Sequence, residues 1–162
     1  MRKVGHSGRT AKKRTYVERT AIRMCSGPMG KAYILLADDE PNVLLTLKLV
    51  LEGDGYEVVT ADSAATAIAL MNQPRRFDAI LTDLNMEKED IGLDVAREAA
   101  KLLPRPAIFI ITGFASIENA RAALKIQVEH FATKPIDLND LMLTLNRFLH
   151  GRPSVVQEGL IT

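Results

Sequence analysis

The sequence predicts a doubly wound α/β domain, in which a five-stranded parallel sheet is covered by helices on both faces. From residue 32 onwards, short apolar runs alternate with amphipathic segments, and this alternation is repeated five times. The apolar runs lack a polar face, which is typical of strands that helices cover on both sides. The chain of 162 residues is long enough for one such domain with a tail at each end.

Five short runs of aliphatic and β-branched residues are predicted to be strands. They span residues 33–37, 57–60, 78–82, 107–111 and, with a weaker pattern, 129–133. All of them are far shorter than the roughly 18 apolar residues that a membrane-spanning helix needs. We therefore expect buried strands and no association with a membrane.

Helical periodicity fills the stretches that separate and follow these strands. The predicted helices span residues 41–52, 63–72, 92–102, 116–125 and 138–150. Pro41 suits the first turn of a helix, and Ser63 and Asp137 are residue types that cap helix starts. Gly53 and Gly55 can end the first helix and turn the chain into the second strand.

Charge is unevenly distributed along the chain. The formal net charge is only +1, but the first 31 residues contain nine basic residues and one acidic residue, which leaves the rest of the chain acidic. We therefore divide the chain into a flexible basic leader at residues 1–30, a folded domain at residues 31–150 and a C-terminal tail at residues 151–162.

The leader carries nothing that identifies a partner or a secretory route. It has one aromatic residue, Tyr16, and no base-reading motif, so a nucleic-acid partner is not expected. Translation from Met29, which would leave the leader without a role, accounts for it equally well. It lacks the apolar stretch of a secretory signal, and the single cysteine, Cys25, fits a reducing cytoplasm. We expect a cytoplasmic protein.

Polar side chains gather where the predicted strands end. The residues are Asp38, Asp39 and Glu40 after the first strand, Asp83 after the third, Thr112 after the fourth and Lys134 after the fifth. Because ligands of such sheets bind outside the carboxyl ends of the strands, we expect these side chains to converge. Carboxylates that repel one another favour a bound divalent cation, and oxygen ligands favour Mg²⁺ or Mn²⁺.

Each of these residues alone has an ordinary structural role open to it, such as a helix cap, a turn or a solvated charge. Their order at successive strand ends, however, favours a shared site. Four segments contain them, namely residues 35–42 (LLADDEPN), 81–86 (LTDLNM), 110–116 (IITGFAS) and 131–137 (FATKPID). Through these segments, residues 32–150 strongly resemble the receiver domain of two-component response regulators, the CheY-like superfamily. The resemblance implies a flavodoxin-like fold with strand order 2-1-3-4-5.

The resemblance also implies a phosphorylation site at Asp83, which would receive the phosphoryl group of a histidine kinase. The catalytic residues would be Asp83, Thr112 and Lys134, since a carboxylate attacks phosphorus only when the charge of the phosphoryl group is neutralised. Mg²⁺ is the implied cofactor, and its ligands would come from Asp38, Asp39, Asp83 and the backbone carbonyl of Asn85. Thr112 and Phe131 would form the switch that reports phosphorylation.

The implied partners follow from the same family. They are a sensor histidine kinase or a phosphotransfer protein of a phosphorelay, and an unidentified output protein that binds after phosphorylation. The domain would not be an enzyme in the usual sense, because it promotes only its own phosphorylation and dephosphorylation. The face formed by the fourth and fifth predicted helices carries charges that could pair in a homodimer, namely Arg121, Lys125, Asp140 and Arg147.

The sequence departs from the family pattern at three positions. Glu87 follows Met86 where the family usually has proline, and Gly92 lies one residue farther along than usual. These changes predict a longer, charged loop at residues 87–91. Gln127 stands where the family usually has glycine, which predicts strain if the backbone there needs a positive φ.

Two alternative functions are also compatible with the sequence. An aspartyl-phosphate phosphatase could use the same strand-end residues with Mg²⁺, although such enzymes typically have a second aspartate where this chain has Asn85. The chain could also be the receiver fragment of a longer regulator.

Overall fold

The computed structural model describes residues 31–150. Five strands form one parallel sheet in the order β2-β1-β3-β4-β5, which confirms the expected topology. The strands are β1 (Tyr33–Ala37), β2 (Glu57–Ala61), β3 (Ala79–Asp83), β4 (Ala107–Thr112) and β5 (His130–Thr133). The predicted leader at residues 1–30 and the predicted tail at residues 151–162 lie outside the described residues.

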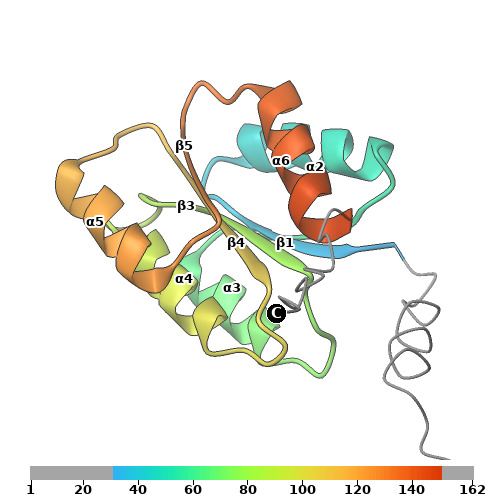
Figure 1. The fold of residues 1–162 in the computed structure, drawn as a ribbon, viewed down its shortest axis with the longest axis horizontal. Helices are drawn as coiled ribbons and strands as arrows, with labels where there is room; N and C mark the ends of the chain where they lie inside the picture. Colours follow the sequence, from blue (N-terminus) through green and yellow to red (C-terminus); the bar gives the residue numbers. More distant parts are fainter. Residues whose placement is uncertain (1–30, 151–162) are drawn as a thin grey trace, which may run out of the picture. The chain divides into compact units, whose positions relative to one another are not determined.

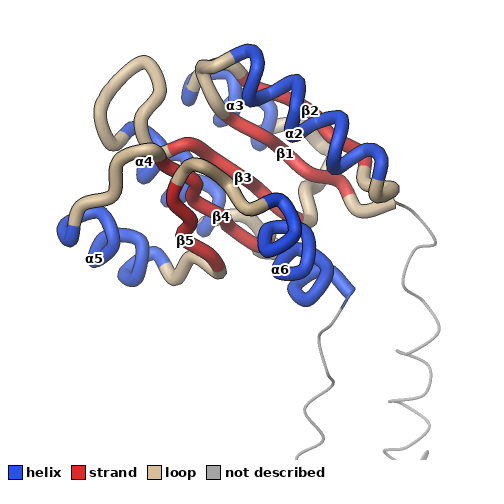
Figure 2. Tube along the Cα trace, turned by 90° about the horizontal axis from the view of Figure 1, so that it is seen from above, coloured by secondary structure: helices blue, strands red, loops and turns tan. Residues whose placement is uncertain are grey.

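Helices cover both faces of the sheet (Figure 1). They are α2 (Pro41–Gly53), α3 (Ala64–Met71), α4 (Ile91–Ala100), α5 (Ile117–Ile126) and α6 (Leu138–His150). Helices α2 and α6 lie on one face, and α3, α4 and α5 lie on the other (Figures 1 and 2). Each side of the sheet has its own apolar core, so the predicted doubly wound architecture is confirmed.

The strand ends differ slightly from the prediction, and the difference bears on the site. Asp83 and Thr112 were expected to follow their strands, but each is the last residue of its strand. The reason is backbone pairing, since Asp83 lies opposite Ile111 and Thr112 lies opposite Thr133 in the parallel ladders. Their backbones are therefore held by the sheet itself.

The predicted helix starts at Pro41, Ser63 and Asp137 are confirmed, whereas α4 spans Ile91–Ala100 and not the predicted residues 92–102. Pro41 is the first residue of α2, and the hydroxyl of Ser63 accepts a hydrogen bond from the amide of Thr66. Asp137 Oδ1 accepts hydrogen bonds from the first amides of α6. Helix α2 ends at Gly53, and Gly55 turns the chain with a φ of +96°. Within residues 31–150, no helix combines the length and apolarity that crossing a membrane requires.

Gln127 ends helix α5 in a left-handed backbone conformation, with a φ of +63°. The condition under which strain was predicted at this position is therefore met, and the left-handed conformation costs a residue with a Cβ about 1 to 2 kcal/mol. The guanidinium of Arg105 donates to the carbonyl oxygens of Ile126 at 3.1 Å and Gln127 at 2.7 Å. Arg105 thus holds the end of α5 in place despite the unfavourable backbone conformation.

Replacement of Gln127 by glycine should stabilise the domain. We expect Gln127→Gly to raise the free energy of unfolding by about 1 kcal/mol, because glycine adopts a positive φ without the Cβ clash. Urea denaturation measures the change, and Gln127→Ala is the control because it keeps the Cβ. A lower stability of the glycine variant would contradict the strain.

Candidate functional site

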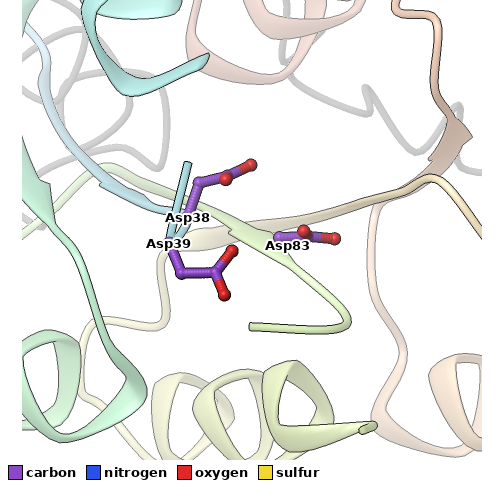
Figure 3. Close-up of side chains that lie close together, drawn as sticks. All are labelled: Asp38, Asp39 and Asp83. Carbon is purple, nitrogen blue, oxygen red and sulfur yellow. The ribbon is translucent and has the colours of Figure 1, made fainter. Parts of the chain in front are cut away.

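Three aspartates lie together at the carboxyl ends of the neighbouring strands β1 and β3 (Figure 3). One carboxylate oxygen from each of Asp38, Asp39 and Asp83 lies within 4.8 Å of the others. Asp38 and Asp83 are buried, whereas Asp39 is exposed. The structure therefore brings together the acidic side chains that the sequence placed at successive strand ends.

Local hydrogen bonds orient the first of these aspartates. The amide of Asp38 donates to the carbonyl of Ala61, the last residue of β2, at 3.1 Å. Its Oδ1 accepts a hydrogen bond from the amide of Glu40 at 2.8 Å. Because these contacts fix the backbone just before Pro41 starts α2, Asp38 is held inward and Asp39 is left facing solvent.

Lys134 places an ammonium group among the carboxylates. Its Nζ lies 2.9 Å from Asp38 Oδ2, 3.2 Å from Asp83 Oδ2 and 3.2 Å from Glu40 Oε1. The amide of Lys134 donates to the carbonyl of Thr112 at 2.7 Å, which ties the residue after β5 to the end of β4. Glu40, whose role the sequence left open, thus belongs to the ion-pair network of the site.

Burial and neighbouring charges both shift the pKa values of Asp83 and Lys134. Burial raises the pKa of Asp83 and the Asp38 carboxylate adds to this effect, while the ammonium of Lys134 opposes it. Burial alone would lower the pKa of Lys134, but the hydrogen bond to Asp38 and the charge of Asp83 outweigh it and raise that pKa above its ordinary value. Lys134 is therefore charged at neutral pH, and one ammonium faces several carboxylates.

The loop between β3 and α4 closes tightly around Asp83. The amide of Asn85 donates to Asp83 Oδ1 at 3.4 Å, and Asn85 Oδ1 accepts from the amide of Asp90 at 2.8 Å. The amide of Gly92 donates to the carbonyl of Leu84 at 2.9 Å. A Cβ at Gly92 would overlap the backbone carbonyl of Asp83, so only glycine fits there. The displaced glycine was visible in the sequence, but this close approach was not.

The two predicted switch residues, Thr112 and Phe131, have different surroundings. Thr112 is buried, and its hydroxyl both donates to the carbonyl of Phe114 and accepts from its amide, each at 3.1 Å. Phe131 is half-buried and packs against the apolar core on the side of α3, α4 and α5. The threonine hydroxyl is thus bonded to the loop that leads into α5.

Comparison with known proteins identifies the family. The family model described as the response regulator receiver domain matches residues 34–146, which is more than half of the chain. The chain belongs to the response regulator receiver family. The match covers the three aspartates, Lys134 and nearly all of the sheet.

The chain is similar to one part of much longer proteins. It is 38% identical over 127 residues to the transcriptional regulatory protein GlrR of Escherichia coli K12, covering 78% of this chain and 28% of GlrR. It is 36% identical over 120 residues to the transcriptional regulatory protein ZraR of Salmonella typhimurium, covering 74% of this chain and 27% of ZraR. The chain spans about a quarter of the length of these curated relatives.

Solved receiver structures share the fold. A CheY-like receiver domain protein from Methanospirillum hungatei is 29% identical, with a TM-score of 0.69 over 74% of this chain and 94% of that chain. A response regulator from Burkholderia pseudomallei is also 29% identical, with a TM-score of 0.65 over 71% of this chain and 66% of that chain. That structure contains a phosphorylated aspartic acid, a calcium ion and citrate.

Removal of the ammonium of Lys134 should destabilise the receiver domain. Asp38 and Asp83 would keep buried carboxylates without their cationic partner, so we expect Lys134→Met to lower the free energy of unfolding by about 2 to 4 kcal/mol. Urea denaturation in the presence of a metal chelator measures this loss. Lys125→Met, which removes an exposed lysine of α5, should change stability by less than about 0.5 kcal/mol. Equal midpoints for the two variants would refute the expectation.

Proposed function

We propose that this receiver domain accepts a phosphoryl group on Asp83 from a histidine kinase or a phosphotransfer protein, and that it signals by binding other proteins. The main support is the cluster of Asp38, Asp39 and Asp83 with the ammonium of Lys134 bonded inside it. In this proposal the domain occupies residues 31–150 between a basic leader and a C-terminal tail, in a cytoplasmic protein.

The transfer is a displacement at phosphorus. A carboxylate oxygen of Asp83 forms a bond to the phosphorus of a phosphohistidine as the phosphorus–nitrogen bond breaks, and the bonding electron pair leaves with the imidazole nitrogen. Lys134 neutralises one phosphoryl oxygen, and the hydroxyl of Thr112 donates to another. For this, Lys134 exchanges one of its present carboxylate contacts for the phosphoryl oxygen.

The acidic cluster fits Mg²⁺. Its donors are oxygen atoms, and the ligands would come from Asp38, Asp39, Asp83 and the backbone carbonyl of Asn85. Oxygen donors favour Mg²⁺ over softer metals, and several carboxylates compensated by one ammonium leave room for more positive charge. When bound, Mg²⁺ supplies positive charge that stabilises the phosphoryl oxygens during transfer. The calcium ion and phosphorylated aspartate of the Burkholderia response regulator agree with this assignment.

Signalling rather than turnover is the role that the site favours. Receiver domains of transcriptional regulators are generally signalling domains without enzymatic turnover. A phosphatase would need a general acid near Asp83, but the side chain two residues on is Asn85, an amide whose oxygen is bonded to the backbone of Asp90. We therefore assign the domain a phosphoacceptor role in which it promotes only its own phosphorylation and dephosphorylation.

The length of the relatives bears on how the domain passes on its signal. The relatives are named transcriptional regulatory proteins and are about four times as long as the matched region, which supports the alternative of a receiver that is part of a longer regulator. Nucleic-acid binding through such an output part is compatible with those names, although a nucleic-acid partner was not expected from the sequence. A homodimer through the edge of the sheet at β5, which α5 and α6 flank on opposite faces, stays part of the proposal.

Loss of the Asp83 carboxylate should abolish phosphorylation. We expect the full chain to be labelled by acetyl phosphate in the presence of Mg²⁺, and Asp83→Asn to show no labelling, because an amide oxygen does not form the acyl phosphate. Intact-protein mass spectrometry measures the added phosphate. Asp94→Asn, which removes an exposed carboxylate of α4, should be labelled like the parent. Labelling of Asp83→Asn at the parental level would eliminate the proposal.

Thr112 should couple the phosphoryl group to Phe131. We expect Thr112→Val to bind beryllofluoride with Mg²⁺ and yet to lose the shift of the Phe131 ring signals that the parent shows, because valine cannot donate to the bound anion. Aromatic NMR spectra with and without beryllofluoride report the response. Thr46→Val, an exposed change on α2, should respond as the parent does. A parental Phe131 response in Thr112→Val would remove the threonine from the switch.

A further inference from the structure

The loop between β3 and α4 is attached to another element by a side chain that the family pattern does not predict. Glu87 reaches across to the amide of Ala64, the first residue of α3, with its Oε1 at 3.2 Å and its Oε2 at 3.4 Å. The two residues are 23 positions apart in the sequence, so no local sequence pattern predicts the contact. This contact is called the Glu87 tether below.

The tether satisfies a donor that would otherwise lack a protein partner. The first amides of a helix have no acceptor within the helix, and the hydroxyl of Ser63 serves the amide of Thr66. The Glu87 carboxylate serves the amide of Ala64 instead, and its negative charge lies at the positive end of the helix dipole. The contact is therefore a charge-assisted hydrogen bond at a favourable place.

The tether also links the two sides of the acidic cluster. On one side, the amide of Asp38 is bonded to Ala61 at the end of β2, three residues before Ala64. On the other side, the amide of Asn85 donates to the carboxylate of Asp83. Asn85 lies two residues before Glu87. A chain of contacts thus runs from Asp38 through the start of α3 and the Glu87 tether to the backbone of Asn85.

The rest of the loop is fixed near its ends. The side chain of Asn85 binds the amide of Asp90, and the side chain of Met86 is buried in the core beneath α3 and α4. Among the hydrogen bonds of the described residues, the Glu87 tether joins the middle of this loop to α3. Without it, the backbone beside Asn85 would keep only the contacts within the loop and the packing of Met86.

We propose that Glu87 is a positioning residue for the metal site, acting through the tether to fix the backbone of Asn85. The inference rests on the proposed function, because the carbonyl of Asn85 is one of the ligands assigned there. Partners that orient metal ligands usually affect metal affinity without touching the metal. Glu87 would affect metal affinity by holding the loop backbone against the start of α3, and not by the effect of its charge on the metal.

Three variants of the full chain test this role. We expect Glu87→Ala to bind Mg²⁺ about 3- to 10-fold more weakly than the parent in calorimetric titrations, the range that loss of one such hydrogen bond predicts. Glu87→Gln keeps an oxygen acceptor and should stay within about twofold of the parent. Glu89→Ala removes an equal charge from an exposed position of the same loop and should also stay within about twofold.

Hydrogen exchange of the Ala64 amide provides the second measurement, made without Mg²⁺. Exchange should be faster in Glu87→Ala than in the parent and unchanged in Glu89→Ala. In every variant, a loss of protection of the Ala64 amide should be accompanied by a loss of Mg²⁺ affinity. A variant that loses protection but keeps its affinity, or an equal loss of affinity in Glu89→Ala, would overturn the positioning role. Failure of the parent itself to bind Mg²⁺ would instead overturn the proposed function.

Discussion

The repulsion between carboxylates at the end of the sheet is the constraint around which this domain is organised. Asp38 and Asp83 are buried next to each other because the adjacent parallel strands β1 and β3 end there. Charges this close interact strongly away from bulk water. The ammonium of Lys134 offsets part of the repulsion, and two apolar cores hold the strands that keep the acids together.

Most of the fold could be predicted from the sequence because two periodicities were clear. Apolar runs marked the strands, and the helical periodicity that begins at Leu138 predicted the first residue of α6. The convergence of Asp38, Asp83 and Lys134 could be predicted because parallel strands all end at one edge. Strand ends were less predictable, because the pairing of Asp83 with Ile111 depends on the neighbouring strand rather than on local sequence.

The features that could not be predicted are contacts between distant segments. The need for glycine at position 92 comes from the backbone of Asp83, and the clamp of Arg105 on Gln127 joins residues 22 positions apart. The Glu87 tether is of the same kind. A charged residue in a loop is most often solvated, so only coordinates distinguish a glutamate that binds a helix start from one that does not.

The hydrogen bonds from Arg105 to Ile126 and Gln127 determine which end of helix α5 is free to move. The helix is fastened at its C-terminal end, where Arg105 holds the carbonyls of Ile126 and Gln127, whereas its N-terminal end follows the loop that is bonded to the Thr112 hydroxyl. Movement of that hydroxyl would therefore displace the N-terminal end of α5 more than its C-terminal end. The displacement would be greatest around Phe114 and Ile117, two apolar side chains already open to solvent.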